Sequence, residues 1–591
     1  MSPRLRLILP GIGYLLAGLV ATWPLVTRLQ GWVPGLGDWG QNMWALWWTR
    51  QSLLSLAQSP FFTNYLFYPE GVTLLFHPLD VSDGLLGIPL YGVFGGDVTY
   101  NLLVLLSFVL GGWGTYLLAF YLTGDRGASF VAGLIFALSP YHFLRLQLGH
   151  LNLSTLQWIP FYVLFLLKFV RQGSRRSGLL AVFFLVLMAL NSWYYVFYCG
   201  LLSLVIIFWP NGEQSGKAAT KLQGSPQTER KSSSSAVASQ FLVRLGRIVL
   251  ILLAAIIVLS SLLIPMFRLL STTVLVGEHN PVRHSVDLLS FWVPGPPSTW
   301  ADWFEDVWIS YAAHNREPGA SAYPGYLVLG LSLIGVLGRR WRRQAVWWWV
   351  VALGFALLAM GPQLQIDGQI LDVQLPYQLL SNIIPAFSIA GIPGRFVVMT
   401  SLALAMLSAY GLVTLATWLS RRKSASAGTV SLWLSVVVGL LIGLEYLAIP
   451  VQLTRTEVNE FYQNMAADAE FYSVIDVKWD ANFLMHAQTV HGKPLVGGWL
   501  ARLPAEQAAY LNQGGIDTAF LALLLGAEWQ VLADDPATLQ AALQSALVER
   551  RVRYIIDHDN TAGPWLEQIV GWPVVYEAGE VVVYSKDWKG D

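Results

Sequence analysis

The sequence predicts a mainly α-helical polytopic membrane protein, a bundle of about eleven spans with a C-terminal extracytoplasmic α/β domain. Of its 591 residues, 55% are hydrophobic and only 12% are charged, and the mean hydropathy is +0.51. So few charges could not cover a soluble protein of this size, whereas lipid accepts apolar side chains on the outer surface. The 26 tryptophans are typical of membrane–water interfaces.

Apolar stretches long enough to cross about 30 Å of hydrocarbon define the spans. They are 6–27, 98–122, 127–141, 153–170, 178–192, 194–209, 247–266, 322–338, 345–361, 394–419 and 431–449. We interpret the first as a retained signal-anchor, because it is long and no small-residue cleavage site follows it. Residues 1–449 are therefore expected to form the transmembrane domain.

Positive charges in the short loops fix the expected orientation, since such loops keep Lys and Arg in the cytoplasm. When the spans alternate, one side collects Arg4, Arg6, Arg126, Arg171, Arg175, Arg176, Lys217, Lys221, Arg230, Lys231, Arg244, Arg247, Arg339, Arg340, Arg342, Arg343, Arg421, Arg422 and Lys423. We therefore expect a plasma (inner) membrane protein with a cytoplasmic N-terminus. The polar, Ser-rich residues 211–243 are expected to form a disordered cytoplasmic loop.

The search for functional residues belongs in the outer loops 28–97, 267–321 and 362–393 and in the C-terminal domain, 450–591. Polar groups near membrane depth are costly to bury and are functional candidates for that reason. Lys plus Arg equal Asp plus Glu at 36 each, so no charge bias points to a nucleic-acid partner. The single cysteine, Cys199, lies in an apolar run and suits a small buried hydrophobe.

The first outer loop begins with GWVPGLGDWGQNMWALWW, which places Asp38 directly outside the first span. Trp44, Trp47 and Trp48 fall on roughly one helical face, which predicts a helix lying flat in the membrane interface. Such a helix would hold Asp38 near the membrane surface. The alternative is that Asp38 only caps this helix. Further along the same loop, Asp80 and Asp83 are candidates for a second acid or for capping.

Cations gather in three other places on the same side. Arg145 and His150 lie in SPYHFLRLQLGHLNLS, a compact turn that suits an anion such as phosphate. With His142 it also has two histidines eight residues apart, which is weak support for a metal site. Arg283, His284 and Asp287 cluster in the next long loop. Arg395, in SIAGIPGRFVVMT, is either a snorkelling interfacial residue or a phosphate clamp.

Residues 450–591 change character and predict one α/β domain. The segments VIDV, PLVGG, VRYIIDH and VVYEAGEVVVYS suggest strands, and 535–549 suggest an amphipathic helix that starts near Asp535. Four polar residues in the first half are candidates for substrate recognition: His486, His491, Lys493 and Arg502. A purely structural lid is an equal alternative.

The layout resembles the GT-C superfamily of polytopic membrane glycosyltransferases, which includes protein O-mannosyltransferases and the lipid A aminoarabinose transferase. The resemblance rests on Asp38 in a Gly-Asp-Trp segment, on SPYHFLRLQLGHLNLSTLQWIPFYVLFLL, on PAFSIAGIPGRFVVMTSLALAMLSAYGL, and on the tail segment MHAQTVHGKPLVGGWLARLP. It covers most of the chain. It implies that a sugar passes from a polyprenyl-phosphate carrier to a glycan, lipid or protein acceptor in the cell envelope.

The same resemblance implies roles for single residues. Asp38 would be the general base or the acceptor-orienting carboxylate, and Arg395 would hold the donor phosphate with His150 or Arg145. Many relatives carry paired acids in the first outer loop, but here Trp39 follows Asp38. A second acid would therefore have to come from Asp80, Asp83 or the loop that holds Asp287. No ligand cluster in the sequence demands a cofactor, although a divalent metal could assist the leaving phosphate.

Two other classes stay open at this point. A multi-span transporter or lipid flippase would show a continuous polar path through the spans. A catalytically inactive glycan-binding relative would lack a carboxylate near Arg395.

Overall fold

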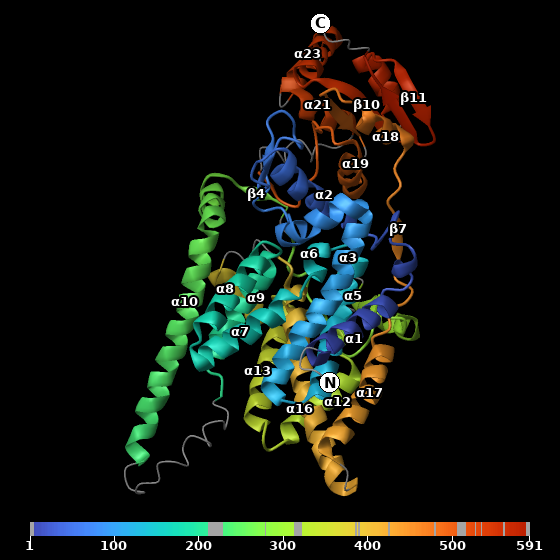
Figure 1. Ribbon diagram of the computed structural model, residues 1–591. Coiled ribbons are helices and arrows are strands. Elements are labelled where there is room, and N and C mark those ends of the chain that lie inside the picture. The colour runs from blue at the N-terminus through green and yellow to red at the C-terminus, as the bar shows by residue number, and fades with distance from the viewer. Residues whose placement is uncertain are drawn as a thin grey trace.

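The computed structural model describes residues 5–210, 229–277, 279–312, 322–384, 387, 391–423, 426–477, 480–504, 516–525, 528–533, 535–558 and 562–586. Figure 1 shows a long bundle of helices that carries a smaller domain with strands at one end, where the C-terminus lies. The predicted class, a mainly helical membrane bundle with a C-terminal α/β domain, is confirmed.

A helix lies in each of the eleven segments predicted to span. These are α1 (Leu5–Ala21), α3 (Val81–Thr123), α4 (Arg126–Ala137), α7 (Trp158–Gln172), α8 (Arg175–Ala189), α9 (Trp193–Ile206), α10 (Glu229–Thr272), α12 (Tyr326–Leu337), α13 (Arg342–Ala359), α16 (Val397–Lys423) and α17 (Ala427–Glu445). In the described part of the chain, six helices are long and apolar enough to cross a membrane, which supports a membrane protein. That the shorter helices also cross the membrane, which would give eleven spans, stays a prediction.

Two expected loops are partly helical instead. Helix α3 begins at Val81 inside the expected loop 28–97 and bends at Gly95, whose φ of +80° interrupts the regular helix. Helix α10 begins at Glu229, so residues 229–243 are not a disordered loop, and residues 211–228 lie outside the described part. Extending a helix costs much less than starting one, which explains why polar residues continue an apolar span.

The C-terminal domain holds a four-stranded sheet in the order β11 (Val574–Ala578), β12 (Val581–Tyr584), β10 (Val552–His558) and β8 (Ser473–Asp476). Strands β10 and β8 are parallel, and the other pairs are antiparallel. Helix α23 (Pro536–Glu549) starts as predicted, because the Asp535 carboxylate accepts a hydrogen bond from the N–H of Ala537. The segment PLVGG forms a single bridge between Leu495 and Val474 rather than a strand.

Shorter elements complete the chain. They are β1 (Trp32–Pro34), α2 (Trp39–Arg50), β2 (Phe62–Thr63), β3 (Val72–Thr73), α5 (Pro140–Gln147), α6 (Leu151–Ser154), β4 (Leu275–Val276), α11 (Glu305–Ala312), β5 (Gln363–Ile366), β6 (Gln369–Gln374), α14 (Pro376–Ile383), β7 (Leu453–Arg455), α18 (Glu460–Ala467), α19 (Ala481–His491), β9 (Leu503–Pro504), α21 (Ile516–Leu525), α22 (Trp529–Leu532) and α24 (Gly563–Trp565). Strands β1 and β7 pair, and so do β4 and β9, so the C-terminal residues are joined to the bundle by two small sheets.

The tryptophan face of α2 packs against the C-terminal domain, so the prediction of a helix lying flat on lipid is wrong. Trp44, Trp47 and Trp48 are buried in one apolar cluster with residues of α18 and α19. The indole N–H of Trp44 donates to Oε1 of Gln488 at 2.7 Å. A large aromatic face must leave water, and here a second domain covers it instead of a bilayer. Figure 1 shows α2 and α19 together between the bundle and the sheet domain.

Gly40 allows the closest approach at this contact. A Cβ atom at this position would lie 2.0 Å from the backbone oxygen of Asn482 in α19. We expect Gly40→Ala to destabilise the protein by about 1–3 kcal/mol, as overpacking usually does. The measurement is thermal unfolding of the purified chain in detergent. Gly443→Ala is the matched control, because a Cβ there meets nothing within 4 Å. Equal melting temperatures for the two variants would contradict the close contact.

Candidate active site

The segment Gly35–Asp38 lies directly against the turn after α5, and its glycines make this possible. A Cβ on Gly37 would lie 2.4 Å from the backbone oxygen of Leu148. The N–H of Asp38 donates to that same oxygen at 2.8 Å. Gly149 has a φ of +68° and turns the chain back, which sets His150 beside Asp38. The glycines of the Gly-Leu-Gly-Asp segment therefore let the loop before α2 pack directly against the turn that follows α5.

Asp38 and His150 form the central contact of the site. Oδ2 of Asp38 lies 2.9 Å from Nε2 of His150. Asp38 occupies the N-cap position of α2, yet its side chain makes no capping hydrogen bond, so the capping alternative is wrong. The Asp38 side chain is 43% exposed, whereas that of His150 is 13% exposed. The carboxylate is thus open to a ligand on one side and held by the histidine on the other.

Arg145 stands behind the histidine. Its Nη1 lies 3.5 Å from Nδ1 of His150, and its guanidinium lies over the ring of Tyr141 at 5.0 Å. Arg145 is fully buried on α5. Because arginine only donates, Nδ1 of His150 accepts and Nε2–H donates to Asp38. The chain of contacts therefore runs from Arg145 through a neutral His150 to an ionised Asp38.

The charges around the pair support this protonation pattern. Burial opposes ionisation of Asp38, but the hydrogen bond from His150 and the positive charge of Arg395 hold its pKa below the ordinary value of 3.8. Burial lowers the pKa of His150 below 6.5, and Arg145 and Arg395 lower it further, against the opposing effect of Asp38. At neutral pH the site thus contains one carboxylate, a neutral imidazole and two guanidiniums.

Arg395 reaches this site from the far end of the chain. It lies in the short 3₁₀ turn Pro393–Phe396 that leads into α16, and it is buried, with 8% of its surface exposed. Its guanidinium lies over the ring of Tyr194 at 4.3 Å. It acts electrostatically on both Asp38 and His150, so the three predicted residues are brought together by the fold.

Asp80 and Asp83 form a second, deeper acidic pair at the start of α3. Both side chains are buried, and Asp80 has a φ of +50°. Burial and the neighbouring Asp83 raise the pKa of Asp80 well above its ordinary value. The charges of Asp38 and Asp80 both act on the hydroxyl of Tyr100, which donates to the backbone oxygen of Gly149 at 3.0 Å.

The outer loop 267–321 contributes structure rather than a charge beside Asp38. The carboxylate of Asp287 accepts hydrogen bonds from the N–H groups of Leu289, Asp367 and Gly368, and so fixes the β5–β6 hairpin. His284 is buried, and its backbone oxygen accepts from the N–H of Gly394 at 2.9 Å. Arg283 is exposed. This loop therefore supports the segment that carries Arg395.

Three of the four candidates in the C-terminal domain make structural contacts with backbone groups. Nζ of Lys493 donates to the oxygens of Asp468 and Glu470, and Nδ1 of His491 accepts from the N–H of Lys493. Arg502 donates to the oxygen of Gly277 beside the β4–β9 pair. All three are buried and make internal contacts.

His486 is the exception, because it reaches the segment that carries Asp38. Its ring lies 5.1 Å from that of Trp39, and its Nε2 donates to the oxygen of Thr456 at 2.6 Å. The contact places α19 against the residue next to Asp38.

Sequence reasoning did not select several residues that the fold places around Asp38. His77 is buried close enough for the Asp38 charge to act on it, although burial dominates and lowers its pKa to about 3. Gln41 also acts on the Asp38 carboxylate, and the side-chain amide of Asn42 donates to the oxygens of Asp38 and Gly149. Gln41 and Asn42 lie one helical turn after Asp38 on α2, and this spacing could have identified them from the sequence.

In the described part of the chain, no three His, Cys, Asp or Glu side chains are grouped so that they could hold a metal ion.

No family model and no curated protein matches the chain. Solved structures do resemble it. The arabinofuranosyltransferase AftD from Mycobacteria matches with a TM-score of 0.54 and 14% identity, over 99% of this chain and 40% of that one.

Two further solved structures resemble the chain less closely. ArnT from Cupriavidus metallidurans, solved with undecaprenyl phosphate, gives a TM-score of 0.46 and 11% identity over 99% of this chain and 98% of that one. The Archaeoglobus fulgidus oligosaccharyltransferase with Zn and sulfate gives 0.48 and 14% identity over 95% and 69%. The chain therefore shares its fold with the arabinofuranosyltransferase AftD, which agrees with the GT-C resemblance of the sequence.

Proposed function

We propose that this protein is a membrane glycosyltransferase that moves a hexosyl or pentosyl unit from a polyprenyl-phosphate donor to an acceptor hydroxyl outside the membrane. One observation carries the proposal: a partly exposed carboxylate, Asp38, meets His150 at 2.9 Å within reach of the charge of Arg395. The fold shared with an arabinofuranosyltransferase supports the general class.

The arrangement suits a single inverting displacement. The acceptor oxygen attacks the anomeric carbon, the bond from that carbon to the phosphate oxygen breaks, and the phosphate leaves with the electron pair. Asp38 orients the acceptor hydroxyl and receives its proton late, as suits a carboxylate of low pKa. A phosphate is a good leaving group and needs no general acid. The step therefore needs one carboxylate and enough positive charge.

The positive charge is supplied by the arginines. The guanidiniums of Arg145 and Arg395 lie in a buried setting, where charge stabilisation is stronger than in water. Together with the one carboxylate of Asp38, these two arginines give the site a net positive charge that favours a phosphate. Preorganised cations of this kind stabilise the negative charge that develops on the leaving group. A divalent metal could add to this effect, but the proposed step does not depend on one.

The test is conversion of a labelled donor by the purified full chain in proteoliposomes. The donors are polyprenyl-phosphate sugars with the label in the sugar, and the products are separated as free polyprenyl phosphate and glycosylated acceptor. We expect both products to appear in equal amounts. A flippase would move the lipid across the bilayer with its sugar–phosphate bond intact, and a binding protein would leave it unchanged. Either outcome would reject the proposal.

The protonation pattern predicts the pH dependence of transfer. Asp38 is ionised above its lowered pKa, so kcat/KM should stay level from about pH 8 down past the ordinary histidine range. In His150→Ala the donated hydrogen bond is lost while burial still raises the pKa of Asp38, so the acid limb should move to higher pH. The measurement is kcat/KM against pH for both proteins. An identical acid limb would show that His150 does not set the ionisation of Asp38.

A further inference from the structure

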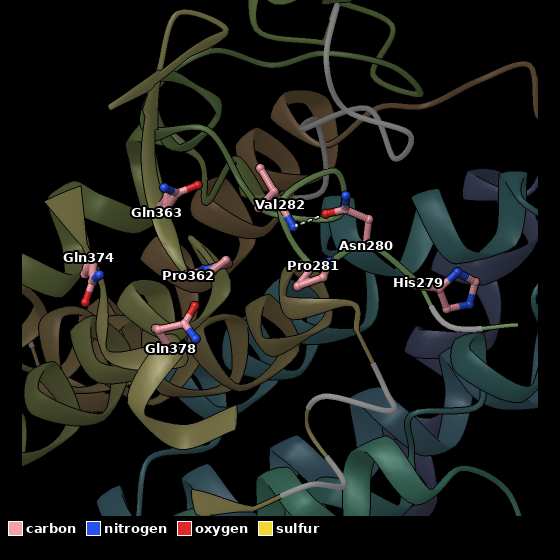
Figure 2. A pocket seen from close by; sticks show the side chains of 8 residues that line it. All are labelled: His279, Asn280, Pro281, Val282, Pro362, Gln363, Gln374 and Gln378. Carbon is pink, nitrogen blue, oxygen red and sulfur yellow. Dashed lines mark hydrogen bonds between the residues drawn. The ribbon is translucent and has the colours of Figure 1, made fainter. Parts of the chain in front are cut away.

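One cavity has a wall that packs against the Arg395 segment, and its lining does not include Asp38, His150 or Arg145. Its volume is about 650 Å³, within the range of about 300–1,000 Å³ typical of small-molecule sites. Figure 2 shows Gln363, Gln374 and Gln378 around one part of this space and His279 and Asn280 around another. The walls come from the loop before His284, from the β5–β6 hairpin and from α14.

The lining has a distinct chemistry. Among the described residues that line the cavity, four have neutral amide side chains and one has an imidazole, and none is an Asp, Glu, Lys or Arg. Each amide both donates and accepts hydrogen bonds, as the hydroxyl groups of a sugar do. Pro281 and Pro362 add apolar surface, against which the C–H groups of a sugar ring can pack. A phosphate or a carboxylate would find no fixed charge in this lining.

Packing ties the cavity wall to Arg395. A Cβ on Gly391 would lie 2.3 Å from the backbone oxygen of His279, so the two segments touch. The N–H of Gly394 donates to the oxygen of His284 at 2.9 Å. The side-chain amide of Gln365 donates to the oxygen of Val282 at 2.7 Å and fastens the hairpin to the same loop. The loop that forms one wall of the cavity thus also packs against the turn that carries Arg395.

We infer that this cavity is a carbohydrate subsite, which binds a neutral sugar unit of the acceptor or of the donor. The inference rests on the proposed function for its role in transfer. The binding event itself depends only on the amides and prolines of the lining. Charged groups would hold the phosphate at Arg395, while the neutral cavity next to it would select the sugar.

The first test is binding without turnover. The detergent-solubilised full chain is titrated with methyl glycosides of neutral hexoses and pentoses, and binding is followed by saturation-transfer NMR. We expect saturable binding, with a dissociation constant raised at least tenfold in Gln363→Met/Gln374→Met. Methionine keeps the length of glutamine but cannot donate to a hydroxyl. A single Gln374→Met variant, at an exposed position, covers the case in which the double variant fails to fold.

Gln369→Met is the matched control, because Gln369 is an exposed residue of the same hairpin outside the cavity. Absence of saturable binding to the wild type, or equal binding by the cavity variants and this control, would overturn the inference. Preference for a neutral capped tripeptide of similar size over every glycoside would also overturn it.

A second readout assigns the sugar to its source. In the transfer assay, a raised KM for the acceptor in Gln374→Met places the acceptor sugar in the cavity, and a raised KM for the donor places the donor sugar there. Unchanged values for both would overturn the subsite. Glycoside binding by a wild-type protein that transfers nothing would reject the proposed function and leave the subsite standing.

Discussion

Asp38→Asn is expected to lower kcat for transfer by about 10²–10⁴-fold, the usual contribution of a positioned general base. The amide can still accept the hydrogen bond that Nε2 of His150 donates to Asp38 at 2.9 Å, so the local structure should persist. It cannot take the proton of the acceptor hydroxyl. Initial rates with the labelled donor, at saturating donor and acceptor, measure the effect.

Asp306→Asn serves as the control for Asp38→Asn, because Asp306 is an exposed acid in the first turn of α11. Both variants should melt at the temperature of the wild type and insert equally into membranes. Transfer that survives in Asp38→Asn at the level of the control would remove Asp38 from the mechanism.

Arg395→Ala is expected to reduce kcat/KM by about 10²–10³-fold, as loss of one preorganised charge-stabilising group does. The guanidinium is buried and lies over Tyr194, and a water molecule that filled its place in the variant would carry no charge. Arg395→Lys should recover only part of the loss, because lysine keeps the charge but not the planar fork that matches a phosphate. The measurement is kcat/KM for the donor at fixed acceptor concentration.

Arg455→Ala is the comparison for Arg395, since Arg455 has a 68% exposed side chain and an ion pair with Glu457 at 3.6 Å. It should leave donor kinetics unchanged. If Arg395→Lys were as active as the wild type, a positive charge alone would suffice, and the hypothesis that the planar guanidinium clamps the phosphate would be wrong. If Arg395→Ala were fully active, the donor phosphate would have to bind elsewhere.

The candidate site was predictable in part because its residues have a local signature. Asp38 stands in a glycine-rich segment at the end of an apolar span, and Arg145 and His150 share one short polar turn. Arg395 was selected in the same way, as a cation beside a span. The position of His77 near Asp38 depends on tertiary packing, which no local pattern encodes.

The sequence also could not show that the C-terminal domain covers the tryptophan face of α2. An apolar face indicates that something removes it from water, but lipid and protein leave the same pattern. Here Trp44 bonds to Gln488, 444 residues further along the chain. Similarly, Asp287 looked like a catalytic acid, yet its carboxylate holds three backbone N–H groups of nearby turns.

The sequence alone determined the membrane class, the positions of the long apolar helices and most strands of the C-terminal domain. Those properties follow from composition and periodicity, which act over neighbouring residues. Only the tertiary structure decided that Asp38 meets His150 and the charge of Arg395, and that the C-terminal domain covers α2. Such contacts join segments more than a hundred residues apart, and their energies depend on packing and burial that no single segment contains.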